Sequence, residues 1–101
     1  MRNNFMDIAE ESKGKLGQLQ RTREKWNEEG QRLLQWRERL GLTRAFIAQE
    51  TGVSPGRLTR LEQGDPVKEA RLICKVYTLT LEKVEMHRAL DKLVESIGIR
   101  K

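Results

Sequence analysis

The chain has little of what enzymes and metal proteins of its size use: among 101 residues there is one cysteine, Cys74, and one histidine, His87. A lone cysteine forms no intramolecular disulfide, which favours the reducing cytoplasm over secretion. Neither residue stands in a catalytic motif, and together they supply too few ligands for a typical zinc site. We expect Cys74 in the core and His87 on a helix surface, and we predict no metal, no cofactor and no enzymatic activity.

Long apolar runs are also missing. No stretch approaches the ~18 residues of a membrane span, and residues 1–11 lack the apolar segment of a signal peptide. Lys and Arg number 20 against 15 Asp and Glu, and the formal charge of +5 favours an anionic partner. The excess lies in residues 31–101, because residues 1–30 hold six basic and six acidic side chains.

Apolar residues recur at helical spacing in six segments, and no segment is a convincing strand. The predicted helices span about 6–27, 31–40, 44–51, 55–63, 67–77 and 81–97. Gly30 is expected to separate the first helix from the second. The predicted fold is therefore all-α: an N-terminal helical extension at 1–29, then a compact five-helix domain at 30–101 that ends in a C-terminal helix.

Residues 44–63 form the most informative segment, two short helices joined by a tight turn. Thr43 and Ser54 are good N-caps, Pro55 suits the first position of a helix, and Gly52 suits a turn with positive φ. Ala48 is small where the second helix crosses the first. Four apolar residues form the expected wedge between the helices: Ile47, Val53, Leu58 and Leu61.

This spacing resembles the helix-turn-helix of the Cro and lambdoid phage repressor family, also called the XRE family, over about residues 31–77. In that family an arginine of the first domain helix pairs with a glutamate late in the recognition helix. Arg37 and Glu62 occupy the matching positions, and Glu62 also begins the Glu-x-Gly that ends this helix in the family. The resemblance therefore implies a structural ion pair between them.

The resemblance also implies that helix 55–63 lies in the major groove of double-stranded DNA. The expected base contacts come from Arg60 first, then Arg57 and Thr59, with Pro55 and Gly56 on the same face. The expected phosphate contacts come from Thr43, Arg44, Ser54 and Lys68. Arg44 stands where relatives commonly have glutamine, and Pro55 and Gly56 stand where many have long polar side chains, so we expect DNA shape to contribute to recognition.

The implied function is a sequence-specific transcriptional regulator, a repressor of a bacterial, phage or mobile-element operon. Because one helix-turn-helix covers few base pairs, the resemblance implies a homodimer. Met86, Leu93 and Ile97 are the expected interface, whereas Val84 and Leu90 are expected to close the core. The alternative is a protein-interaction module, such as an antitoxin or a partner subunit of a regulator, with the N-terminal helix as a further surface for a protein partner.

Overall fold

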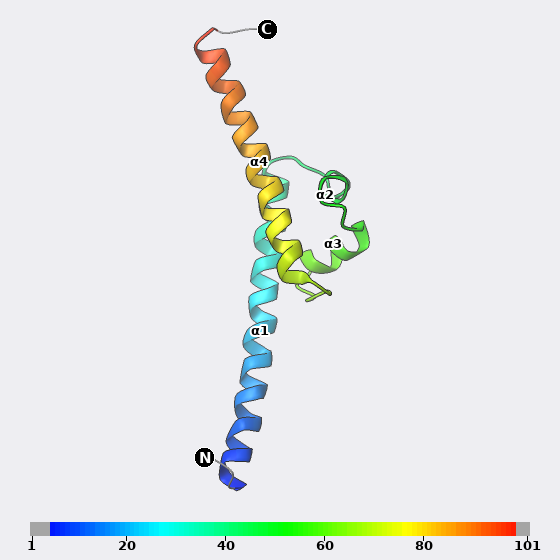
Figure 1. Cartoon of the computed structure of the whole chain (residues 1–101), viewed down its shortest axis with the longest axis vertical. Coiled ribbons are helices and arrows are strands. Elements are labelled where there is room, and N and C mark those ends of the chain that lie inside the picture. Colours follow the sequence, from blue (N-terminus) through cyan, green and yellow to red (C-terminus); the bar gives the residue numbers. More distant parts are fainter. Residues whose placement is uncertain (1–4, 99–101) are drawn as a thin grey trace.

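The computed structural model describes the backbone of residues 5–98 and the side chains of residues 22–98. This part of the chain contains four helices and no strand: α1 (Phe5–Arg39), α2 (Arg44–Thr51), α3 (Pro55–Glu62) and α4 (Ala70–Ser96). The two long helices, α1 and α4, lie side by side over part of their lengths, and α2 and α3 lie on one flank of the pair (Figure 1). The all-α prediction is confirmed, but the predicted number of helices is wrong.

The first difference is at Gly30, which does not separate two helices. The helix α1 continues through this residue, and Gly30 is buried against α3. A Cβ atom at position 30 would lie 2.8 Å from the Glu62 carbonyl oxygen and closer still to that of Leu61. The glycine therefore permits close approach of α3 to α1, and the loss of helix propensity, about 1 kcal/mol, is offset by this packing.

The second difference is in α4, which replaces two predicted helices. No glycine or proline interrupts residues 70–96, and the Thr80 hydroxyl bonds within the helix to the Val76 carbonyl at 2.8 Å. Residues 67–69 lie before the helix begins. The predicted break at residues 78–80 is therefore wrong, because threonine can satisfy its hydroxyl inside a helix.

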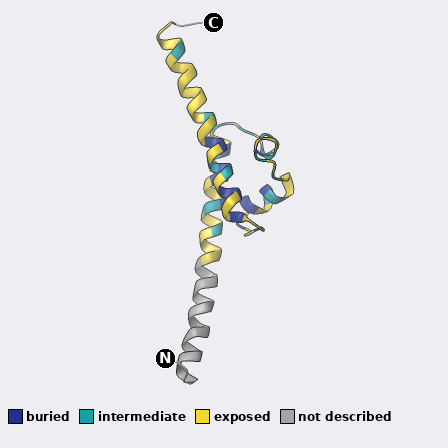
Figure 2. Ribbon diagram, in the orientation of Figure 1, coloured by how far each residue is buried: buried dark blue, intermediate teal, exposed yellow. Residues whose placement is uncertain are grey.

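The core lies where the four helices meet (Figure 2). It consists of ten buried apolar residues contributed by α1, the helix-turn-helix segment, the following loop and α4: Leu33, Ile47, Leu58, Leu61, Val67, Ala70, Ile73, Cys74, Tyr77 and Leu81. Trp26 packs against this core from the segment that the sequence assigned to an extension. No helix within residues 5–98 is long and apolar enough to cross a membrane.

Two core expectations for the end of α4 have different outcomes. Val84 is half-buried, whereas Leu90 exposes 56% of its surface, so its assignment to the core is wrong. Leu90 is exposed because α4 extends beyond the end of α1, as Figure 1 shows. Cys74 is buried and His87 is exposed.

Candidate nucleic-acid interface

The turn between α2 and α3 has the caps that the sequence predicts. The Thr43 hydroxyl accepts a hydrogen bond from the Phe46 amide at 3.0 Å, and the Ser54 hydroxyl accepts one from the Arg57 amide at 3.3 Å. Gly52 ends α2 with φ 77°, a conformation that L side chains rarely adopt. Pro55 is at the start of α3, where its missing N–H is not needed. These local features set where α3 begins and its direction.

The apolar wedge holds α3 against the rest of the domain. Ile47 and Leu58 are fully buried and Leu61 nearly so, while Ala48 and Val53 are half-buried around them. The inner face of α3 is thereby anchored, and its other face is left for contacts outside the domain.

Glu62 forms the centre of a buried polar cluster. Its carboxylate is 2% exposed and accepts hydrogen bonds from Arg37 Nε at 3.0 Å, from Arg37 Nη2 at 3.2 Å and from the Tyr77 hydroxyl. Arg37 Nε also lies 3.0 Å from the Tyr77 hydroxyl oxygen, and its Nη1 donates to the Leu42 carbonyl at 3.0 Å. The structure thus brings Arg37 and Glu62 together, and Tyr77 joins this pair of α1 and α3 to α4.

The charge state of Glu62 follows from its partners. Burial by itself would raise the pKa of this carboxyl, but hydrogen bonds from Arg37, Tyr77 and Arg44 outweigh it and hold the pKa below its ordinary value. Burial would lower the pKa of Arg37, but the hydrogen bonds and the charges of Glu62 and Tyr77 together outweigh it, and the pKa is raised. Burial and the bond to Glu62 raise the pKa of Tyr77. The ion pair is therefore charged at neutral pH.

Arg44 belongs to the same cluster and reaches the surface. Its Nε and Nη2 each lie 3.0 Å from Glu62 Oε1, and 39% of its side chain is exposed. The sequence predicted a phosphate contact for Arg44, but it did not reveal that Arg44 and Tyr77 both form hydrogen bonds with Glu62. The residue that could have indicated these contacts is Glu62, because a buried carboxylate requires several hydrogen-bond donors.

The outer face of α3 carries the residues predicted to contact bases. Pro55, Gly56 and Arg60 are exposed, and Arg57 and Thr59 are half-buried. The Thr59 hydroxyl donates to the Pro55 carbonyl at 2.9 Å, so part of its polar capacity is used within the helix.

Both arginines of this face turn toward the loop between α3 and α4. Arg60 Nε donates to Asp65 Oδ2 at 2.9 Å, and Arg57 Nη2 donates to the backbone carbonyl of Lys68. The Lys68 side chain, predicted to contact phosphate, is exposed in this loop. The loop therefore contacts Arg57 and Arg60, and it adds Lys68 to the side chains that the sequence predicted for DNA.

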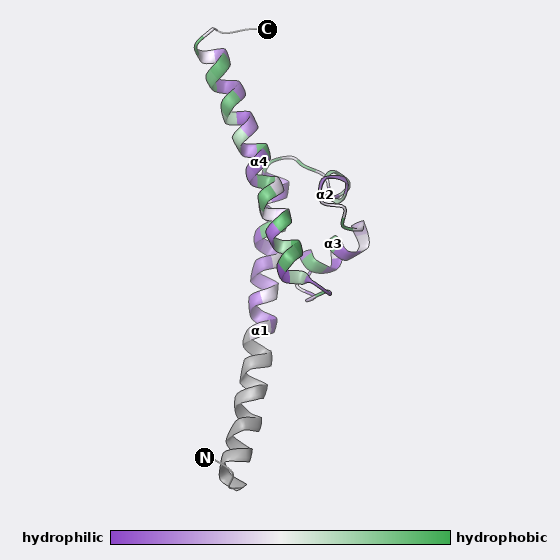
Figure 3. Cartoon of the chain, in the orientation of Figure 1, coloured by the Kyte–Doolittle hydropathy of each residue, from purple (hydrophilic) through white to green (hydrophobic). Residues whose placement is uncertain are grey.

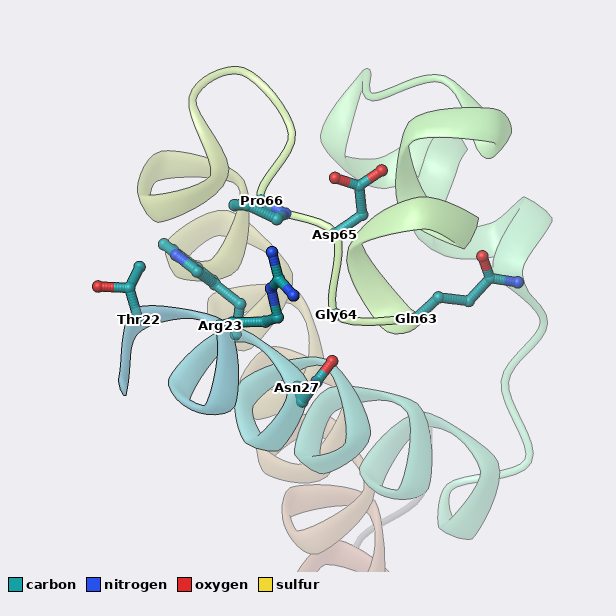
Figure 4. A pocket seen from close by; sticks show the side chains of 8 residues that line it. Thr22, Arg23, Asn27, Gln63, Gly64, Asp65 and Pro66 are labelled. Atoms are coloured by element: carbon teal, nitrogen blue, oxygen red, sulfur yellow. The ribbon is translucent and has the colours of Figure 1, made fainter. Parts of the chain in front are cut away.

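A pocket lies beside this loop, between it and α1 (Figure 4). Arg23 and Asn27 line it from α1, and Gly64, Asp65 and Pro66 line it from the loop. A Cβ atom at position 64 would overlap the Asn27 side chain, and its φ of 89° also favours glycine. The contact between Asn27 and Gly64 holds the loop, and with it Asp65, in a defined place relative to α3.

Cys74 and His87, of two residue types often used in catalysis, both belong to α4, where Cys74 is buried and His87 is exposed. Burial raises the pKa of the Cys74 thiol to about 11, so the thiol is protonated at neutral pH. Within the described residues no group of three His, Cys, Asp or Glu side chains is arranged to hold a metal ion.

The fold and the polar cluster define a helix-turn-helix domain, and a comparison with protein families agrees. Residues 30–86 match the helix-turn-helix domain family, more than half of the chain, and the protein belongs to this family. The match contains α2, α3, the end of α1 and the first part of α4, and it confirms the resemblance seen in the sequence. DNA is the partner that this family indicates. No curated protein and no solved structure matches the chain.

Proposed function

We propose that this protein is a sequence-specific regulator of transcription that binds double-stranded DNA with α3 in the major groove and represses a bacterial, phage or mobile-element operon. The observation that carries the proposal is the two-sided character of α3. Its inner face is buried through Leu58, Leu61 and Glu62, and its outer face presents Arg57 and Arg60. A rigidly anchored helix with an arginine-bearing outer face suits recognition of base edges.

The intramolecular contacts of Arg57 and Arg60 are weak enough to be exchanged for DNA. The Arg60–Asp65 pair has side chains 59% and 46% exposed, and pairs of this kind contribute about 0–1 kcal/mol. A bidentate contact of arginine with guanine O6 and N7 is worth roughly 1–3 kcal/mol of discrimination. The exchange therefore favours a DNA site that offers guanine to these side chains.

Phosphate contacts are proposed for the residues around the two helix starts. Arg44 is held by Glu62 at the start of α2 with part of its guanidinium side chain exposed. Thr43 and Ser54 precede helix N-termini, whose free amides attract anions. Lys68 adds an exposed positive charge in the neighbouring loop. Because Arg44 is positioned before DNA binds, it loses less conformational entropy on contact than a free arginine.

Selection of bound DNA from a random pool tests the proposal. We expect a defined consensus, with two symmetric half-sites about one helical turn apart if the protein binds as the homodimer that the family resemblance implies. The double variant Arg57→Ala/Arg60→Ala should lose specific binding but keep weak, salt-sensitive binding. Arg71→Ala is the control, because Arg71 is exposed on α4 outside the recognition helix. Specific binding that survives the double substitution would refute the groove assignment.

Repression is tested separately with a reporter gene whose promoter overlaps the selected site. Expression of the protein should lower transcription, and the Arg57→Ala/Arg60→Ala variant should not. The competing function, a protein-interaction module such as an antitoxin, predicts instead that no consensus emerges from the pool and that a second protein copurifies in stoichiometric amount.

A further inference from the structure

The loop between α3 and α4 holds an acidic side chain against one of the arginines proposed to contact bases. Figure 3 shows that this loop is mostly hydrophilic. Arg60 Nε donates to Asp65 Oδ2 at 2.9 Å. A carboxylate beside a DNA-binding surface repels phosphate and so reduces the affinity for every DNA sequence. The presence of Asp65 at this place therefore needs a reason other than affinity.

The way in which α3 ends places Asp65 beside Arg60. The Gly64 amide donates to the Leu61 carbonyl at 3.0 Å, and the Asp65 amide donates to the Arg60 carbonyl at 2.9 Å. With Gly64 at φ 89°, these two bonds form a Schellman motif. In this motif the residue after the glycine is bonded to the residue five positions before it. The backbone therefore brings Asp65 next to Arg60, and the contact of their side chains adds to this.

The loop is fixed to the rest of the domain on both sides of Asp65. Figure 4 shows Asn27 directed at Gly64 and the Asp65 side chain directed away from α1. Val67 is 6% exposed and belongs to the core, and its amide donates to the Asp65 carbonyl at 2.8 Å. The backbone of Asp65 is thus held before and after the residue, so its carboxylate is a defined anchor for Arg60.

The contact occupies only one part of the Arg60 guanidinium group. Asp65 accepts from Nε, and among the residues whose side chains are described no hydrogen bond occupies the two Nη groups. The Nη groups form one end of the planar guanidinium, and two parallel donors at such an end match O6 and N7 of guanine. Arg60 can therefore contact guanine while it keeps its contact with Asp65.

We propose that Asp65 is a positioning residue that determines specificity: it holds Arg60 in the orientation that reads guanine and disfavours contact of the same arginine with phosphate. An arginine that is oriented in advance loses less side-chain entropy when it binds the base. If Arg60 turned instead to a phosphate, it would leave the Asp65 carboxylate unpaired beside the negative DNA backbone. This inference deepens the proposed function and rests on it, because it requires α3 to lie in the major groove.

The expected effect is moderate. The side chains of Arg60 and Asp65 are 59% and 46% exposed, so water and salt screen their attraction. Ordering one long side chain before binding is worth about two- to tenfold in affinity. We expect Asp65→Asn to reduce the preference for guanine by this factor and to bind random-sequence DNA more tightly than wild type does.

The test measures the Kd of the full chain for the selected DNA site and for a series of sites in which each base pair is replaced in turn. Arg60→Ala identifies the base pair that Arg60 reads, because the preference there should disappear. At that base pair Asp65→Asn should reduce the preference about two- to tenfold. At all other base pairs Asp65→Asn should keep the wild-type preferences, which also checks that the variant is folded.

Glu69→Gln is the matched control, because it removes the same charge from the same loop. Glu69 is exposed next to the start of α4, and the acidic partner of Arg60 is Asp65. The control should keep the wild-type preference at the base pair that Arg60 reads. No variant alters the α4 residues predicted for a dimer interface, Met86, Leu93 and Ile97, which are exposed. Any self-association is therefore the same in all of them.

Three results would overturn this inference and leave the proposed function in place. An unchanged preference in Asp65→Asn would show that Arg60 needs no support. An equal loss in Glu69→Gln would show that only the charge of the loop matters. A preference lost at a different base pair would show that Asp65 contacts a base itself. A wild-type protein that selects no consensus, or a consensus that Arg60→Ala leaves unchanged, would instead overturn the groove assignment together with this inference.

Discussion

Replacing Glu62 by glutamine tests the buried cluster that joins α1, α3 and α4. The substitution keeps the shape of the side chain and removes its charge, which leaves Arg37 buried without a counter-ion. Removing one partner of a buried ion pair costs about 3–5 kcal/mol. Domains of this kind are stabilised by roughly 5–15 kcal/mol in total, so the loss is a large fraction of the free energy of unfolding.

The matched control is Asp65→Asn, which makes the same chemical change in an exposed pair. Arg60 and Asp65 lie 2.9 Å apart, nearly the same distance as Arg37 and Glu62, yet both side chains are about half exposed. We expect a loss under about 1 kcal/mol, because water and salt already screen this pair. The two variants therefore separate the effect of burial from that of distance.

The assay is urea unfolding followed by tryptophan fluorescence, since Trp26 and Trp36 both pack against the core. With a slope of about 1.5 kcal/mol per molar urea, a loss of about 3 kcal/mol shifts the midpoint of Glu62→Gln by about 2 M. Asp65→Asn should shift it by well under 1 M. Equal shifts for the two variants would refute the argument that burial makes the Glu62 pair important for stability.

Three further predictions concern pH, packing and thiol chemistry. The pKa of Glu62 in the folded protein is below its ordinary value of 4.5. The contribution of its charge to the free energy of unfolding is therefore complete at neutral pH and is lost as the pH falls below about 4.5. Acid titration of stability should thus be less steep for Glu62→Gln, and equal slopes would contradict this. Gly30→Ala should destabilise by about 1–3 kcal/mol through overlap with the α3 carbonyls, whereas Gly56→Ala, which meets nothing within 4 Å, should be neutral or stabilising in thermal unfolding. Cys74 should react with a thiol reagent at least tenfold more slowly in native protein than in urea, because the thiol is buried and its pKa is raised. Rapid labelling of the native protein would contradict this and show that the thiol is accessible.

The cluster around Glu62 also connects stability to the proposed DNA contact. Glu62 holds Arg44 at the surface with the same carboxylate that neutralises Arg37 in the interior. A change at Glu62 therefore acts on the position of a proposed phosphate ligand as well as on the core. Arg44→Ala removes only the exposed member and should weaken DNA binding with a smaller effect on folding.

The local features of the helix-turn-helix were predictable because each depends on a few neighbouring residues. The caps at Thr43 and Ser54, the proline at the start of α3 and the positive φ of Gly52 follow from steric and hydrogen-bonding rules within one turn of chain. The wedge residues Ile47 and Leu58 follow from helical periodicity. The family assignment followed from the same spacing.

What the sequence could not determine depends on residues far apart in the chain. Gly30 looked like a helix break, but only the approach of α3 shows that it is a contact between helices. Arg44 and Tyr77 join Glu62 only after three helices have packed, since 18 and 15 residues separate them from it. Leu90 has the apolarity of a core residue, and only the extension of α4 beyond α1 leaves it on the surface. Hydrophobicity determines which residues avoid water, whereas the tertiary arrangement decides which of them the same chain can cover.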